Sequence, residues 1–207
     1  MFDLIDAPIF DDAFVQWWEP QYDVIEHDEA EYQCLIQLVR EDVDSFGAIS
    51  EESFRRMIEW KSARTKGYVH WSNYRLYIET VKGCLSMNGD HRLDAICKLP
   101  GVAERVGSTV LHFIYPDTYP IFDFRTLAAL RHLGADLGKS FSVNNYYRFR
   151  EYLISTQVDL NRWTLRELDR AIFAYHKCSP EIFGVTPGDG RRAQSTTLPR
   201  YCPRSGA

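Results

Sequence analysis

The chain reads Leu99-Pro100-Gly101-Val102-Ala103-Glu104-Arg105 and, after an apolar stretch, Tyr119-Pro120-Ile121-Phe122-Asp123. Proline disfavours helical backbone at Leu99 and glycine allows a sharp reversal, so we expect one helix to end here. Apolar residues at helical spacing predict a second helix that restarts near Ala103. The first of these segments is therefore expected to join two helices through a tight turn.

The helix starts that follow this turn have a chemistry of their own. The first-turn amides of the second helix lack partners within it, and such N–H groups at the positive end of a helix bind phosphate without lysines. A third helix, with Leu127, Leu130 and Leu133 on one side and Gly134 at its end, is expected after Asp123. Asp123 is therefore the predicted N-cap of that helix.

Other helices are predicted from the same signals. Asp28 with Glu31, and Thr164 with Glu167, match the capping-box pattern. Ser50 is the predicted cap of a helix that carries Phe54, Met57 and Ile58. Strand signals are few, so the expected fold class is all-α.

The residues from Leu99 to Asp123 resemble the hairpin of the helix-hairpin-helix DNA glycosylases of the endonuclease III type. The resemblance extends as a helical pattern over residues 50–178. It implies a helical bundle in two lobes, with a cleft between them and an essential aspartate. Two positions depart from the family: Ala103 replaces a glycine, which fits only if no positive φ is needed there, and Arg105 stands where bifunctional members carry a Schiff-base lysine. An arginine stays protonated and cannot attack a sugar carbon, so the monofunctional type is expected.

The resemblance also implies roles for individual residues. Asp123 would be catalytic, stabilising positive charge at the anomeric carbon as the base leaves and orienting the attacking water. The implied DNA-binding residues are Leu99, Pro100, Gly101, Val102, Ala103, Arg105 and Arg125. The backbone carbonyls of Cys97, Leu99 and Val102 would hold a monovalent cation. No other cofactor is expected, since the cysteines lack the close cluster that binds iron and sulfur in some relatives.

A base-excising enzyme needs a pocket for the everted base. The candidates for its walls are Trp60, Lys61, Arg64, Trp71, Asn73 and Tyr74. Each has a structural alternative: the tryptophans as core, the cations as surface charges, and Asn73 as a helix cap. Likewise, Asp123 is also suited to capping alone, and Arg125 to pairing with a surface acid.

Charge divides the chain unevenly. Residues 1–52 hold 15 acidic residues and one arginine, a net charge of −14, and residues 53–207 have a net charge of +9. The expected units are an acidic helical segment (1–49), the glycosylase-like domain (50–178) and a tail rich in Pro, Gly and Arg (179–207). The acidic segment either solubilises the protein, faces away from DNA, or shields the binding surface against non-specific contact.

Composition sets the remaining expectations. The chain has 207 residues, five scattered cysteines and no apolar stretch long enough for a membrane span, so a cytoplasmic monomer with reduced thiols is expected. Its expected partner is double-stranded DNA that contains a damaged or modified base, in repair or in defence against phages with modified DNA. Two alternatives stay open: a non-catalytic helix-hairpin-helix DNA-binding module, against which the negative charge of Asp123 argues, and a helical interaction protein in which Pro100-Gly101 is only a turn.

Overall fold

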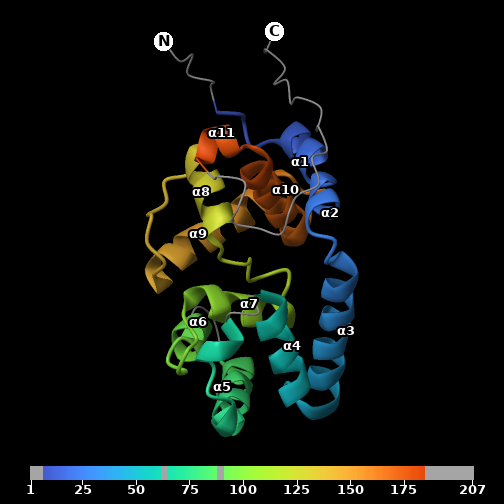
Figure 1. Ribbon diagram of the computed structural model, residues 1–207, viewed down its shortest axis with the longest axis vertical. Coiled ribbons are helices and arrows are strands. Elements are labelled where there is room, and N and C mark those ends of the chain that lie inside the picture. Colours follow the sequence, from blue (N-terminus) through green and yellow to red (C-terminus); the bar gives the residue numbers. More distant parts are fainter. Residues whose placement is uncertain (1–6, 62–64, 88–90, 185–207) are drawn as a thin grey trace.

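The computed structural model describes residues 7–61, 65–87 and 91–184, and every regular element in these residues is helical, which confirms the all-α class. The elements, shown in Figure 1, are α1 (Asp12–Trp18), α2 (Gln21–Ile25), α3 (Glu29–Phe46), α4 (Glu51–Lys61), η1 (Thr65–Tyr68), η2 (Trp71–Asn73), α5 (Tyr74–Ser86), α6 (Arg92–Ile96), α7 (Glu104–Ile114), α8 (Phe124–His132), α9 (Val143–Asp159), α10 (Leu165–Cys178) and α11 (Pro180–Phe183). No helix among the described residues is both long and apolar enough to cross a membrane.

The helices form two groups along the long axis of the molecule (Figure 1). In the upper group, α10 contacts α1, α2, α8, α9 and α11. In the lower group, α4 contacts α3, α5 and α7, and α6 packs against α5 and α7. One hydrophobic core runs through both groups, from Phe14 in α1 to Tyr175 in α10. The acidic segment therefore shares its core with the rest of the chain.

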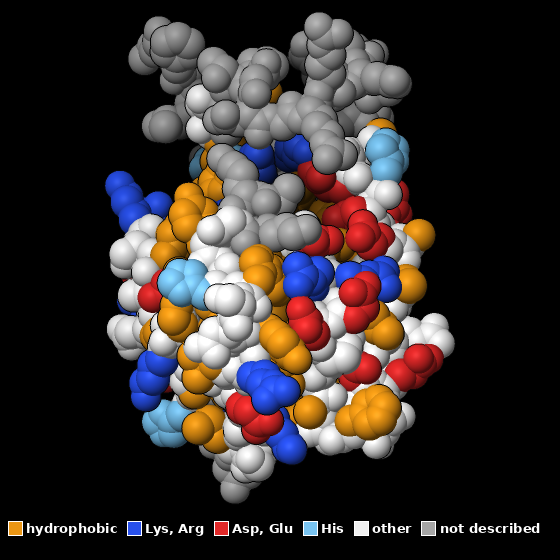
Figure 2. Space-filling view, turned by 60° about the horizontal axis from the view of Figure 1, so that its bottom comes forward, with side chains coloured by type: hydrophobic (Ala, Val, Ile, Leu, Met, Phe, Trp, Pro, Cys, Tyr) orange, Lys and Arg blue, Asp and Glu red, His pale blue; other side chains and the backbone are white. Residues whose placement is uncertain are grey.

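The acidic segment also supplies partners for basic residues in α10 and just before it. Arg166 and Arg170 are both buried, and a buried charge is costly unless it is paired. The ion pairs are Arg162 with Asp12, Arg166 with Glu29, Arg170 with Glu19, Asp23 and Glu29, and Lys177 with Glu26. Acidic and basic side chains also lie next to one another on the face shown in Figure 2. Much of the charge contrast along the chain is thus neutralised in the folded protein.

Two tyrosines, Tyr68 and Tyr77, contact the turn between α6 and α7. Gly101 has φ +76°, and a Cβ there would lie 1.9 Å from the carbonyl oxygen of Tyr68. The buried hydroxyl of Tyr77 donates to the carbonyl of Pro100 at 2.7 Å. Ala103 has φ −96°, so the position needs no glycine and its departure from the family pattern is accommodated.

The predicted caps have mixed outcomes. Thr164 with Glu167 forms the predicted capping box, and Ser50 Oγ accepts from the backbone N–H of Ser53. The capping box predicted at Asp28 is wrong. Asp28 does stand at the N-cap of α3, but its side chain makes no cap hydrogen bond and instead accepts from the hydroxyl of Tyr22. A tertiary hydrogen bond has replaced the local one.

Candidate active site

Asp123 lies where three helices meet. It caps α8, as predicted, because its Oδ1 accepts from the backbone N–H of Arg125 at 3.1 Å. Its Oδ2 is 3.1 Å from Nζ of Lys61, the last residue of α4, and 3.1 Å from Nη2 of Arg105 in the first turn of α7. One carboxylate, 14% exposed, thereby ties α4 and α7 to the start of α8.

These donors keep Asp123 ionised. Burial disfavours the charged carboxylate, but Lys61, the Arg125 amide and Arg105 together outweigh that effect. The pKa of Asp123 is therefore held well below its usual range. A fixed negative charge is available here at any pH near neutrality.

Arg105 connects this carboxylate to the turn. It follows Ala103 by two residues and is the more exposed partner, with 43% of its side chain accessible against 10% for Lys61. Its guanidinium lies over the rings of Phe124 and Phe141, at 5.8 and 5.3 Å from their centres. The side chain of Arg105 therefore links the exposed turn to the carboxylate of Asp123.

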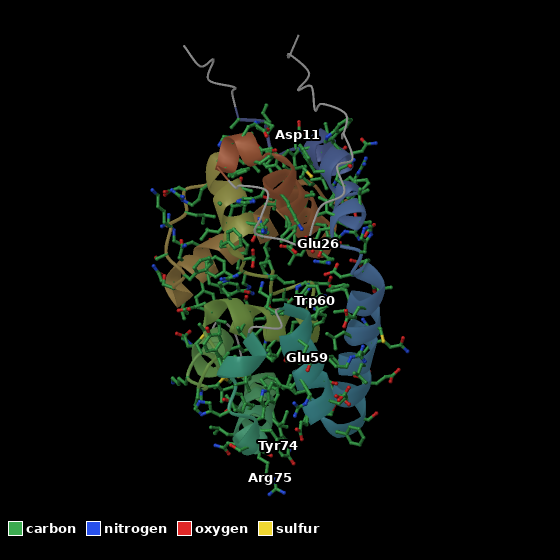
Figure 3. The ribbon with its side chains drawn as sticks, viewed as in Figure 1. Asp11, Glu26, Glu59, Trp60, Tyr74 and Arg75 are labelled. Atoms are coloured by element: carbon green, nitrogen blue, oxygen red, sulfur yellow. The ribbon has the colours of Figure 1, made fainter. Side chains whose placement is uncertain are left out.

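Asp123 and Lys61 line a cavity of about 130 Å³ at the junction of the two helical groups. Its wall comprises Tyr22, Glu26, Asp28, Trp60, Lys61, Ile121, Asp123, Arg166, Asp169 and Phe173. Glu26 and Trp60, labelled in Figure 3, lie on either side of this junction. The wall thus combines aromatic rings with both signs of charge.

The α10 side of the cavity carries a second buried carboxyl group. Asp169 Oδ2 accepts from Nη1 of Arg166 at 3.1 Å, and Nη2 of the same arginine is 3.1 Å from Glu29. Burial raises the pKa of Asp169 to about 6, although Arg166 and Lys61 act in the opposite direction. Burial also raises the pKa of Asp28. Carboxyl groups perturbed in this way, on a cavity, are typical of functional sites.

Four lining side chains have a buried polar atom without a hydrogen-bond partner. These atoms are Asp28 Oδ1, Trp60 Nε1, Arg166 Nε and Asp169 Oδ1. Buried polar atoms are nearly always satisfied, and an unsatisfied one costs about 1–3 kcal/mol. All four atoms are covered by neighbouring protein atoms, so they mark uncompensated polar burial beside the cavity and not a surface that a ligand contacts.

The structure divides the predicted base-pocket residues. Trp60 and Lys61 lie on the cavity beside Asp123. Trp60 also fulfils its structural alternative, because its ring packs against Tyr32 and Phe113. Arg64 lies outside the described residues.

The other three predicted pocket residues do not line this cavity. Trp71 packs against Phe54 and lies 4.3 Å from the guanidinium of Arg55. Asn73 is exposed and makes no side-chain cap hydrogen bond, and Tyr74 lies at the far lower end of the molecule (Figure 3). The predicted pocket residues lie close together in sequence, between Trp60 and Tyr74, but the structure does not bring them to one cavity.

The predicted DNA-binding residues are also divided by burial. Pro100, Gly101 and Ala103 are exposed. Leu99 and Val102 are each 4% exposed, so their side chains are not available for contact with DNA.

Arg125 is 9% exposed and stacks its guanidinium over Phe124 and Phe173. Its contribution to the site is the backbone amide that holds Asp123.

The cation predicted at the turn stays a prediction. Of the three carbonyl groups proposed for it, that of Leu99 accepts a hydrogen bond from the N–H of Val102 at 3.1 Å, while Cys97 precedes the turn. Within the described residues, no group of three or more His, Cys, Asp or Glu side chains is placed to hold a metal ion.

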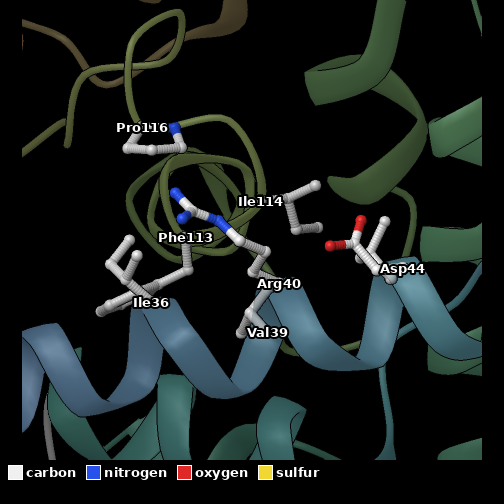
Figure 4. A pocket seen from close by; sticks show the side chains of 8 residues that line it. Ile36, Val39, Arg40, Asp44, Phe113, Ile114 and Pro116 are labelled. Carbon is white, nitrogen blue, oxygen red and sulfur yellow. The ribbon is translucent and has the colours of Figure 1, made fainter.

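Sequence reasoning missed the residues that α2, α3 and α10 bring to the cavity. Asp169 and Arg166 follow Asp123 by more than 40 positions in the sequence. Tyr22 and Asp28 lie in the acidic segment (1–49), which was expected to be a separate unit. The available signal was the oppositely charged pair Arg166 and Asp169, three positions apart on one side of α10. A second cavity of about 130 Å³, between α3 and α7, is floored by Ile36, Val39, Phe113 and Ile114 and shares no residue with the first (Figure 4).

Comparison with known proteins adds no relative: no family model, curated protein or solved structure matches the chain. The site must therefore be interpreted from its own geometry.

Proposed function

We propose that the chain is a monofunctional DNA glycosylase, which everts a damaged or modified nucleotide and hydrolyses the bond between its base and deoxyribose. The single observation that carries the proposal is the position of Asp123. It is an ionised carboxylate on a cavity, joined through Arg105 to an exposed Pro-Gly turn. This arrangement fits the resemblance of residues 99–123 to the helix-hairpin-helix glycosylases.

In the proposed reaction, the electron pair of the glycosidic bond leaves with the base and C1′ gains positive charge. The carboxylate of Asp123 stabilises that charge and orients the attacking water, whose proton is taken up by the departing base anion. It is already ionised in the resting protein, because Lys61 and Arg105 offset the cost of its burial. Arg105, the more exposed partner, is placed to exchange Asp123 for a DNA phosphate, which would uncover Oδ2.

The same contacts favour hydrolysis over a Schiff-base route. Formation of a Schiff base at C1′ requires an unprotonated amine. Arg105 does not lose its proton, and Lys61 is paired as an ammonium with Asp123. Water is then the nucleophile, and the DNA backbone stays intact.

The size of the cavity supports eversion of the nucleotide. A volume of about 130 Å³ admits one base and not a duplex. The DNA would therefore lie outside, against the turn and the first-turn amides of α7, with only the target base inside. The oligomeric state and the location in the cell stay predictions.

The test is mass spectrometry of free bases released from several duplex DNAs, including damaged DNA and phage genomes with modified cytosine. The native protein should release a base, and Asp123→Asn, which retains an oxygen for the helix cap, should release none while still binding DNA. Asp136→Asn is the matched control, because Asp136 is fully exposed and pairs only with Arg148. Base release by Asp123→Asn at the native rate would remove Asp123 from the mechanism.

A second function, a non-catalytic DNA-binding module, is favoured by one observation. Asp123 is neutralised by two cations, so its charge no longer argues strongly against binding without catalysis. In that case the carboxylate serves only to join α4, α7 and α8. Retained binding to duplex DNA with no base released from any substrate would favour this alternative.

A further inference from the structure

The residues that lead into Asp123 form a buried stretch without regular structure. Residues 119–122 lie between α7 and α8 and are all buried, and within the described chain no helix or strand includes them. Buried backbone N–H and C=O groups need hydrogen-bond partners, which helices and strands normally supply. Here side chains must supply them instead, and those side chains then determine where Asp123 lies.

We propose that Ser108 and His112, two fully buried residues of α7, are positioning residues that hold the carboxylate of Asp123 in place. Neither lines the cavity, so both act through the backbone of residues 119–122. The proposal rests on the proposed function, because it explains how the same aspartate is held for the reaction.

The contact nearest to Asp123 is made by Ser108. Its Oγ accepts from the backbone N–H of Phe122, the residue before Asp123, at 3.0 Å. The same hydroxyl donates to the carbonyl of Arg105 at 3.1 Å, and the guanidinium of Arg105 pairs with Asp123. One hydroxyl group therefore joins the backbone that precedes Asp123 to the backbone of a residue that binds its carboxylate.

The second contact is made by His112, and its partners assign its tautomer. Nδ1 lies 2.9 Å from the carbonyl oxygen of Tyr119, which can only accept, so Nδ1 has the proton. Nε2 is then the acceptor for the hydroxyl of Tyr32, at 2.8 Å. Burial lowers the pKa of His112 to about 3, so the ring stays neutral near pH 7. Since Tyr32 belongs to α3, this histidine connects the acidic segment to the stretch before Asp123.

The other end of the stretch is held by α9. The hydroxyl of Tyr146 donates to the carbonyl of Pro120 at 3.2 Å, and Nε of Arg150 donates to the carbonyl of Thr118 at 2.8 Å. A displacement of about 1 Å at a reacting group can slow a reaction roughly a hundredfold. The contacts from α7 are therefore expected to matter for the placement of Asp123 and not for stability alone.

The first experiment measures hydrogen exchange at the backbone amide of Arg125 in the full chain, by NMR. This amide lies in the first turn of α8, where no carbonyl of the helix can reach it, so its protection depends on Oδ1 of Asp123. Ser108→Ala should accelerate its exchange at least about tenfold. Ser53→Ala is the matched control, because Ser53 is equally buried and its hydroxyl bonds Asp42. Equal acceleration by both variants, or by neither, would overturn the proposal.

The second experiment tests His112. Nitrogen-15 NMR of the native protein at pH 7, with the signals identified by their loss in His112→Asn, should show a proton on Nδ1 and none on Nε2. The opposite tautomer would leave the Tyr119 carbonyl without a donor and would overturn the role of His112.

Two variants then separate the hydrogen bond of His112 from its packing. An asparagine can place an N–H group near the position of Nδ1, and a leucine cannot, while both lose the contact with Tyr32. His112→Leu should therefore accelerate exchange at the Arg125 amide at least about tenfold more than His112→Asn does. Equal exchange rates in the two variants would contradict the assigned hydrogen bond.

Base release separates this proposal from the proposed function. If the native protein releases a base from DNA, Ser108→Ala should slow a single turnover roughly tenfold to a hundredfold without weakening DNA binding. Ser53→Ala should change neither quantity. No release from any DNA would overturn the proposed function, and the exchange and tautomer results would still decide how Asp123 is held. Release at the native rate by Ser108→Ala would overturn the positioning role and leave the glycosylase standing.

Discussion

Asp169 should favour the folded state more at mildly acidic pH than at neutral pH, and Asp169→Asn should remove that contribution. Burial raises the pKa of Asp169 from 3.8 to about 6 in the folded protein. The groups around it are Arg166 and Lys61, which oppose the shift, and Asp123, which adds to it. The folded protein therefore binds a proton at Asp169 more tightly than the unfolded chain does.

The sign follows from linkage. A raised carboxyl pKa means that the folded state holds more protons between the two pKa values, so stability rises as pH falls through about 6 and levels off below about 4. From pH 7.5 to pH 5.0, this one group contributes roughly 1.5 kcal/mol of added stability. The amide introduced by Asp169→Asn does not titrate, so the difference between the two proteins isolates this contribution from other titrating groups.

The assay is urea unfolding of both proteins at pH 7.5 and pH 5.0, with the midpoint and slope taken from each curve. Relative to the variant, the native protein should gain roughly 1.5 kcal/mol at the lower pH. If the difference in stability between the two proteins is the same at both pH values, or changes in the opposite direction, then burial does not raise the pKa of Asp169 in the folded protein.

The remaining predictions concern the turn and the nucleophile. Gly101→Ala should lower the free energy of unfolding by at least about 3 kcal/mol, because the strain of a positive φ adds to a clash with Tyr68. Gly134→Ala should lower it by only about 1–2 kcal/mol, because Gly134 has φ +95° but no atom within 4 Å of the added Cβ. Thermal unfolding compares the two variants. Tyr77→Phe should cost about 1–3 kcal/mol and loosen the turn, because it leaves the Pro100 carbonyl without its donor, and hydrogen exchange at the turn would report the change. Borohydride should trap no adduct with DNA, since Lys61 is paired as an ammonium, and a trapped adduct lost in Lys61→Gln would show a lyase instead.

Local signals predicted the elements that carry local information. The capping box at Thr164, the cap at Asp123 and the reversal at Gly101 each depend on residues within a few positions of one another, and the structure contains all three. Asp28 matched the same capping pattern and was mispredicted, because Tyr22 offers its carboxylate a partner from another helix. Local rules fail where a tertiary contact competes for the same side chain.

The candidate site likewise has features that the sequence predicted and features that only the structure revealed. Periodicity and helix signals in the sequence were enough to specify an all-helical chain, the turn at Pro100-Gly101 and the aspartate that begins α8. Only the folded structure decided that Lys61 and Arg105 neutralise this aspartate, and that the acidic segment pairs with α10. It also decided that Asp169 shares a cavity with Asp123. The physical reason is the range of the interactions. Hydrogen bonds within a helix join residues three or four positions apart, so short sequence patterns reveal them. Burial and charge pairing join residues that are far apart in the chain and close in space, so they can be identified only from the folded structure.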